Sequence, residues 1–168
     1  EEIHGGSFQE IGSRDEGSVA AISAIDGGSC TVLRTPTMAI VLNRVYCNSF
    51  RGMEKGDFVE RFSFLSKTEI VTKGGKVYFE TEIIPQEGEL KMGGLQIDSE
   101  DPEFKVGRAR GDLGRAISMA RRFSEWSFVR SALRSGADFI VMGGSLQTGF
   151  PGESELANSI YGEVGSAG

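Results

Sequence analysis

VAAISAIDGGS, residues 19–29, is a run of small and branched apolar residues that ends in one acid and two glycines. Such a run is typical of a buried β-strand, and the Gly-Gly pair is typical of a tight exit from it. The strand therefore presents one carboxylate, Asp26, close to its end. A rigidly held acid of this kind suits a metal-binding site, although Asp-Gly-Gly is also an ordinary turn sequence.

A second stretch has the same shape. It is ADFIVMGGSL, residues 137–146, and it combines an apolar strand, Gly-Gly and Ser. We expect a short strand from Asp138 to Met142, and its apolar composition predicts burial on both faces. Two matching strand exits indicate two neighbouring strands of one sheet.

The length and composition indicate one soluble globular domain over residues 1–168, and the order of the expected strands and helix indicates the α/β class. The chain has 168 residues, 39% apolar and 25% charged, with a net charge of −6. No apolar run approaches the roughly 20 residues of a membrane span, so we expect no membrane partner. The negative charge argues against a broad basic nucleic-acid surface and leaves room for a local one.

The cysteine and histidine content excludes a conventional zinc site. The chain has two cysteines, Cys30 and Cys47, and one histidine, His4, whereas a zinc site wants about four such ligands. A disulfide between the cysteines remains an alternative, but we expect reduced thiols and a cytoplasmic protein. His4 falls in the polar, Gly/Ser-rich segment 1–18, which we expect to be a flexible arm with an exposed His4.

The first half of the chain predicts consecutive antiparallel strands. We expect a strand over 18–34 with a bend or bulge near 27–28, and a second over 37–50. Residues 57–71 fit a strand or an amphipathic helix, and we choose the strand. Gly74-Gly75 suits a tight hairpin turn inside 72–84.

The second half predicts a loop, a long helix and the short strand. We expect a loop over 85–101 and a helix from near Pro102 to about Ser135, ended by Gly136. Three residues are candidate N-caps of this helix: Asp98, Ser99 and Asp101. An apolar helix face is predicted from 3.6-residue periodicity at Leu113, Ala116, Ile117, Ala120, Phe123 and Trp126. A further short helix fits 153–161.

Three antiparallel strands, a helix and then a parallel strand is the ribonuclease H-like order. In that fold, the first strand and the strand after the helix lie side by side, and so do their carboxylates. Glu125, in ARRFSEWSFVRSAL, is the helical acid that could join Asp26. Its alternative role is a surface partner of Arg121, at the i,i+4 spacing of an ordinary helical ion pair.

The segments AIDGGS (24–29) and ARRFSEWSFVRSALRSGADFIVMGGSL (120–146), in this order, resemble the NurA nuclease family. The resemblance covers roughly residues 19–150. It implies an Mn²⁺- or Mg²⁺-dependent deoxyribonuclease of DNA end resection, acting as 5′-to-3′ exonuclease and single-strand endonuclease. Implied partners are DNA, a HerA-type hexameric translocase and a second copy in a homodimer. Asp26 and Glu125 match two metal ligands of the family.

The third ligand position falls on Gly143, where the family pattern has Asp. Loss of one carboxylate weakens a two-metal site, since Mg²⁺ and Mn²⁺ prefer oxygen ligands. Asp138 lies at the start of its strand and is not expected to substitute. The chain is therefore either a nuclease disabled at Gly143, or a non-catalytic scaffold that binds a translocase or its own copy. A third alternative is an unrelated α/β domain with structural Asp-Gly-Gly turns.

The remaining feature is an arginine-rich segment, RARGDLGRAISMARR, at 108–122. It fits a solvated helix face, or a strip that contacts phosphates near the site. Under the second alternative, Arg121 and Arg122 are the candidate DNA-binding residues.

Overall fold

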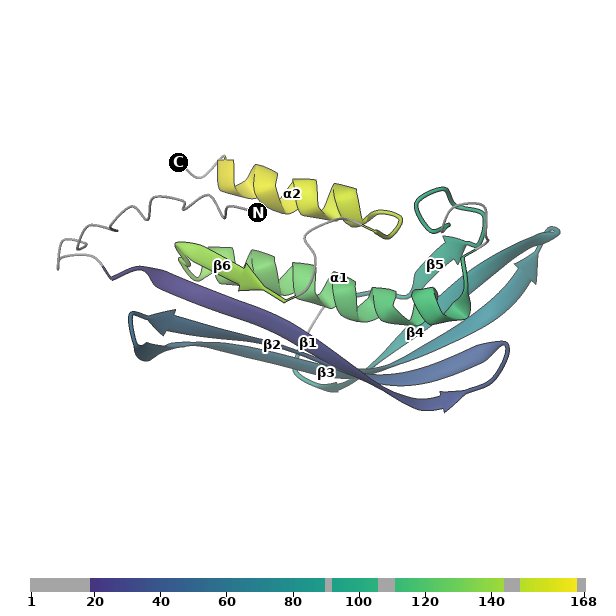
Figure 1. Cartoon of the computed structure of the whole chain (residues 1–168), viewed down its shortest axis with the longest axis horizontal. Coiled ribbons are helices and arrows are strands. Elements are labelled where there is room, and N and C mark those ends of the chain that lie inside the picture. The colour runs from purple at the N-terminus through teal and green to yellow at the C-terminus, as the bar shows by residue number, and fades with distance from the viewer. Residues whose placement is uncertain (1–18, 90–91, 106–110, 144–148, 166–168) are drawn as a thin grey trace, which may run out of the picture.

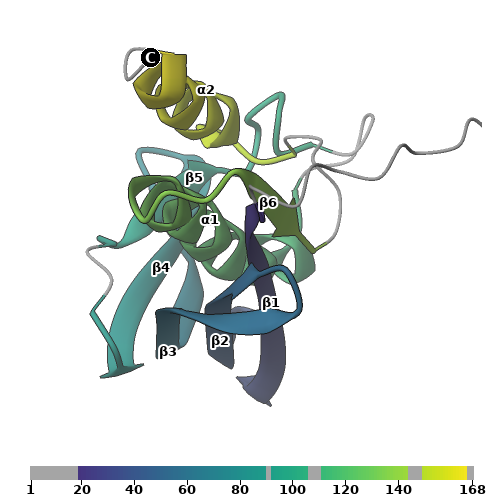
Figure 2. The same ribbon diagram turned by 90° about the vertical axis from the view of Figure 1, so that its left-hand side faces the viewer.

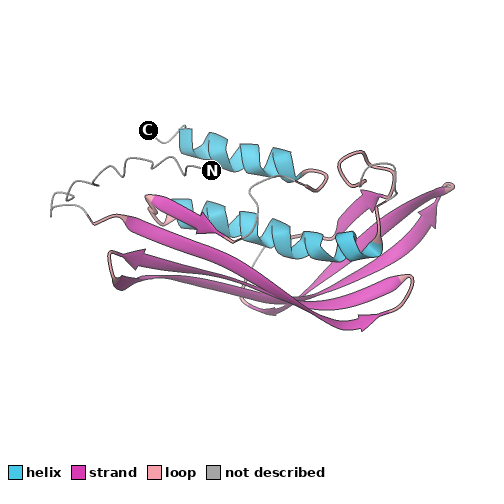
Figure 3. Ribbon diagram, in the orientation of Figure 1, coloured by secondary structure: helices cyan, strands magenta, loops and turns pink. Residues whose placement is uncertain are grey.

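The computed structural model describes residues 19–89, 92–105, 111–143 and 149–165. In chain order, the described elements are five strands, a helix, a sixth strand and a second helix (Figures 1 and 3). Their bounds are β1 Ala21–Arg34, β2 Met38–Arg51, β3 Glu54–Lys73, β4 Lys76–Glu87, β5 Leu95–Asp98, α1 Leu113–Arg134, β6 Phe139–Met142 and α2 Glu153–Gly165. The mixed α/β class expected from the sequence is confirmed.

The strands form one mixed sheet in the order β5-β4-β3-β2-β1-β6. Every neighbouring pair is antiparallel except β1 and β6, which run parallel, with Ile25 opposite Met142. After β5, the chain passes through α1 and then forms β6 on the far side of β1. A long connection of this kind is needed because β6 runs parallel to β1. The predicted pairing of the first strand with the strand after the helix is therefore confirmed.

The hairpin between β3 and β4 turns at the predicted place. Gly74 and Gly75 both have positive φ, 57° and 79°, which is the conformation of a tight two-residue hairpin turn. Residues 57–71 are strand rather than helix, within β3. The irregularity of β1 lies between Thr31 and Leu33 rather than at the glycines, where the pairing with β2 continues in register.

Both helices lie on the same side of the sheet, with α1 directly on it and α2 stacked on α1 (Figures 1 and 2). Side chains alternate along each strand, so one face of the sheet packs under α1. The core residues include Ile25, Val45 and Phe62 from the strands and Trp126 and Phe128 from α1. The opposite face, called here the open face, is covered by none of the described helices.

Helix α1 begins later than the sequence suggested. Asp112 is its N-cap, and its Oδ1 accepts a hydrogen bond of 2.8 Å from the Arg115 backbone N. The expected start at Pro102 is wrong, because residues 102–104 form turns and an Asx-type bond holds Asp101 to Glu103 N. The predicted end is confirmed, since Gly136 follows Ser135 with φ 83°.

Two other expectations on the second half are corrected. The loop expected over 85–101 contains the end of β4 and the whole of β5, which pairs with β4. Strand β6 is not buried on both faces, because Phe139 and Val141 are 54% and 58% exposed. It lies at the edge of the sheet beyond β1, and its outward residues have no helix over them. The short helix at 153 is confirmed as α2.

The described part of the chain bears on three smaller expectations. Both cysteines are free thiols, Cys30 exposed and Cys47 buried. Among the described residues, no helix is long and apolar enough to cross a membrane. The arm at 1–18 with His4, and Gly144, Ser145 and Leu146 of the second Gly-Gly stretch, lie outside the described residues.

Candidate functional site

The two Gly-Gly stretches singled out in the sequence meet in space, but the first is not a strand exit, because β1 continues through Gly27 and Gly28 to Arg34. The backbone N of Gly143 donates a hydrogen bond of 3.0 Å to the carbonyl of Ile25, which extends the parallel pairing of β1 and β6 by one residue. A Cβ added at Gly143 would lie 2.6 Å from Asp26 Oδ1. Any side chain at position 143 would therefore meet the Asp26 carboxylate.

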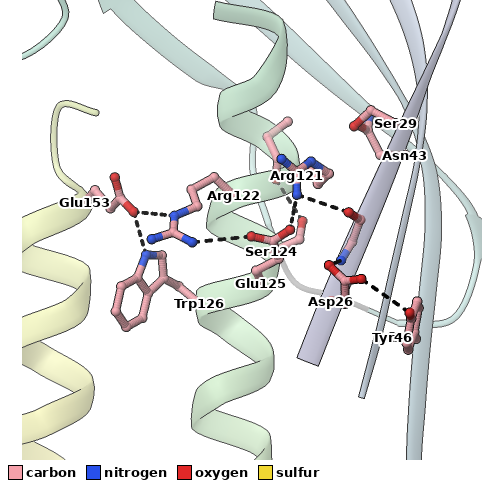
Figure 4. Close-up of polar contacts among 12 residues, drawn as sticks. Asp26, Ser29, Asn43, Tyr46, Arg121, Arg122, Ser124, Glu125, Trp126 and Glu153 are labelled. Atoms are coloured by element: carbon pink, nitrogen blue, oxygen red, sulfur yellow. Dashed lines mark hydrogen bonds and ion pairs between the residues drawn. The ribbon is translucent and has the colours of Figure 1, made fainter. Parts of the chain in front are cut away.

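Asp26 is exposed and held by two local donors (Figure 4). Its Oδ1 accepts from the Gly27 backbone N at 2.8 Å, and its Oδ2 accepts from the Tyr46 hydroxyl at 3.4 Å. Tyr46 stands directly opposite Asp26 in the pairing of β1 with β2. The carboxylate is thus oriented by its neighbours but open to solvent, as a ligand-binding acid must be.

Glu125 is buried, in contrast to the exposed Asp26, and its side chain is only 2% exposed. Arg121 Nη1 forms an ion pair with its Oε1, and Arg122 Nη1 lies 3.5 Å from its Oε2 (Figure 4). Burial raises the pKa of the Glu125 carboxyl above its usual value of 4.5, and the two arginines oppose that rise. The predicted pairing with Arg121 is present, but at an interior position rather than on the surface.

Glu125 nevertheless reaches β1. A Cβ on Gly27 would lie 2.7 Å from Glu125 Oε1, so only a glycine leaves room for this carboxylate. Arg121 Nη1 also donates to the carbonyl of Gly27 at 3.2 Å. Gly27 is therefore the point at which the helix and the first strand touch, with Arg121 bound to both.

The two acids approach Gly27 from opposite faces of the sheet. Val45 and Cys47 on β2 are fully buried under α1, whereas Tyr46 between them is on the open face. Asp26 pairs with Tyr46 and so belongs to the open face, while Glu125 comes from α1 on the covered face. The parallel pairing brings together Asp26 and Gly143, and the sheet backbone separates Asp26 from Glu125.

Arg122, for which the sequence suggested a phosphate contact, is an interior ion-pair residue. It is 8% exposed, and its Nε donates to Glu153 Oε1 at 2.6 Å. Arg121 is partly exposed, but its guanidinium donates hydrogen bonds to the Glu125 carboxylate and to the Gly27 carbonyl. Of the other arginines in the segment, Arg108 and Arg110 lie outside the described residues.

Glu153, at the start of α2, is a residue that sequence reasoning missed. It is fully buried and accepts from Arg122, from Trp126 Nε1 at 2.7 Å and from the Gly149 backbone N at 2.7 Å. These bonds join α2 to α1 and continue through Arg122 to Glu125. An acid in the first turn of a helix was the available sign, since its N-terminus attracts negative charge.

The described donors around Asp26 do not by themselves make a divalent metal site. Among the described residues, no group of three or more His, Cys, Asp and Glu side chains is placed to hold one. Asp26 is a single carboxylate, Gly143 offers no side chain, and Glu125 is already neutralised by two guanidinium groups. Asp138 is no substitute, since its Oδ2 accepts from the Ala21 backbone N at 2.7 Å, at the far end of β6.

Comparison with protein-family models, curated proteins and solved structures finds no match.

Proposed function

We propose that this chain is a ribonuclease H-like DNA-processing domain of the NurA kind, with a metal-dependent nuclease site that is incomplete in its ligands. The observation that carries the proposal is the parallel pairing of β1 and β6, which sets Gly143 against Asp26. The family pattern requires an acid at each of these positions. The order of strands, helix and parallel strand is also the order of that fold.

Restoring the acid at position 143 is the direct test. In Gly143→Asp, the new side chain starts beside the Asp26 carboxylate on the same face, so two carboxylates share one site. Asp26 must rotate to make room, which its exposure permits. Paired carboxylate oxygens are what Mn²⁺ and Mg²⁺ prefer. We expect Mn²⁺ binding by calorimetry and cleavage of labelled single-stranded DNA in this variant, and neither in the natural chain.

Two matched variants make the result interpretable. Gly143→Asn has the same size without the charge, and Asp26→Asn in the Gly143→Asp background removes the other carboxylate. Both should lose metal binding and cleavage. If Gly143→Asp folds, shown by an unchanged circular dichroism spectrum, and neither binds Mn²⁺ nor cleaves DNA, the nuclease proposal fails.

A non-catalytic scaffold of the same fold is the second candidate. The observation that favours it is the arginine pair on Glu125, which occupies the carboxylate that the nuclease would need. This candidate predicts no cleavage in either form of the chain. It also predicts binding to a HerA-type translocase, or self-association as a homodimer, that sedimentation of the natural chain would detect.

A further inference from the structure

The open face carries a depression beside Asp26 that none of the roles above uses. Its volume is about 590 Å³, and it is lined by Arg44, Tyr46, Asn48, Lys55, Val59, Glu60 and Arg61. Three cations face one carboxylate among these residues, in a chain whose net charge is −6. Asp26 lies beside the depression and Glu87 pairs with Arg61, so Arg44 and Lys55 are the cations left to attract a polyanion.

The cations are available to a ligand. Arg44 donates its Nε to Ser63 Oγ at 3.2 Å, and neither Arg44 nor Lys55 pairs with a carboxylate within the described ranges. Arg61 pairs with Glu87, but both side chains are largely exposed, 54% and 43%. An exposed pair of this kind contributes little, so a phosphate group can replace its carboxylate.

An aromatic ring lies among these cations. Tyr46 is 39% exposed on the same face, and Val59, also in the depression, is 51% exposed. Exposed aromatic rings on a sheet surface, flanked by basic side chains, bind unpaired bases by stacking while the cations hold the phosphates. Base faces inside a duplex are not accessible to such a ring.

The depression also leads to the candidate site, because the Tyr46 hydroxyl contacts Asp26 at 3.4 Å. We propose that the open face binds single-stranded DNA, with a base stacked on Tyr46 and the backbone phosphates on Arg44, Lys55 and Arg61. The choice of DNA rests on the proposed function, while the choice of a single strand rests on the exposed ring. A strand bound in this way passes beside Asp26 and position 143.

The test is fluorescence anisotropy of a labelled short oligo(dT) with the full chain in EDTA. Binding without metal separates this proposal from the nuclease proposal, which needs Gly143→Asp and Mn²⁺. We expect Tyr46→Leu to weaken binding about tenfold, as loss of one stacked base does, and Tyr46→Phe to retain it. Arg44→Ala should weaken binding and reduce the slope of log affinity against log salt by about 0.7.

Lys76→Ala is the control, because Lys76 is an exposed cation at the β3–β4 turn, outside the depression. It should bind oligo(dT) nearly as the natural chain does. The proposal is overturned if the folded natural chain does not bind oligo(dT), or binds a blunt duplex equally well. It is also overturned if Lys76→Ala loses as much affinity as Arg44→Ala.

Discussion

Gly27 is the residue on which the contact between sheet and helix depends. An added Cβ would lie 2.7 Å from Glu125 Oε1, 3.1 Å from Val45 Cγ2 and 3.2 Å from Arg121 Cγ. Distances of this order are shorter than ordinary van der Waals contact, and the neighbours are held in the core and in an ion pair. The glycine is thus required by space and not by backbone conformation.

Gly27→Ala should therefore destabilise the fold, by about 1–3 kcal/mol as overpacking does. The neighbouring Gly28 supplies the control, because a Cβ there meets nothing within 4 Å. Thermal unfolding of both variants measures the difference, with Gly28→Ala close to the natural chain. Equal melting temperatures for the two variants would contradict the packing described at Gly27.

Glu153 is the second residue with a large expected effect. Burial tends to raise its pKa, but the hydrogen bonds from Gly149, Trp126 and Arg122 outweigh burial and lower the pKa below its usual 4.5. Glu153→Gln removes the charge from these bonds and should cost about 1.5–3 kcal/mol at neutral pH. Glu155→Gln changes an exposed acid in the same helical turn and is the matched control.

The lowered pKa of Glu153 also predicts a pH dependence. A carboxyl with a depressed folded-state pKa contributes stability above its unfolded value of 4.5, and loses it as pH falls through the folded value. The stability gap between the natural chain and Glu153→Gln should therefore close in acid. Urea unfolding of both proteins across the acid range measures this, and a gap that widens below pH 4.5 would refute it.

At the residue scale, the sequence allowed Asp26 and Gly143 to be chosen as candidate site positions. Asp26 and Gly143 were singled out by their Gly-Gly stretches and by the family pattern, and the pairing of β1 with β6 places them together, although β1 continues past its glycines. The burial of Glu125 was not predictable, because it depends on a glycine nearly a hundred residues earlier in the chain. Tyr46 and Glu153 were missed for a similar reason, since each gains its role from partners on another element.

At the scale of elements, the long strands were predictable, whereas the short strand β5 and the start of α1 were not. The glycine hairpin turn and the alternation of side chains fixed the long strands. Several acids precede α1, and each has a cap-like sequence, but only Asp112 bonds the first turn of α1, whereas Asp101 caps a separate turn. Strand β6 was assigned to the interior because its residues are apolar, yet only Ile140 and Met142 pack on the core, while the alternating Phe139 and Val141 lie on the open face and are exposed.

The cap at Asp112 gives the prediction that belongs to this scale. Asp112→Ala removes the acceptor for the Arg115 backbone N and should cost about 1 kcal/mol, while Asp112→Asn or Asp112→Ser retains most of the stability. Chemical denaturation of the three variants gives the order. An alanine variant as stable as the asparagine variant would show that the helix gains nothing from this cap.

At the scale of the whole molecule, the two helical layers lie on one side of the sheet, and none of the described helices lies on the other. The sheet, α1 and α2 follow one another (Figure 2), and the ion pairs of Arg122 with Glu125 and Glu153 run through the helical layers. The open face exposes Arg44, Tyr46 and Arg61, whereas the covered face holds the core together with buried polar residues such as Asn43 and Thr68. A stable one-sided core and an accessible opposite face are the division that a binding surface on a sheet requires.

The reactivity of the two cysteines can test whether α1 covers the sheet stably, because Cys30 is exposed and Cys47 is buried beneath α1. Cys30 is exposed, whereas Cys47 is fully buried on β2 under α1, and burial raises the pKa of its thiol to about 11. We expect a thiol reagent to modify Cys30 rapidly and Cys47 only when the layers separate. In Cys30→Ser only the slow reaction should remain, and urea should accelerate it as it promotes global unfolding. β2 has a neighbouring strand on each side, so local fraying of an edge does not expose Cys47. Rapid modification of both thiols in the native protein would mean that α1 does not cover the sheet stably.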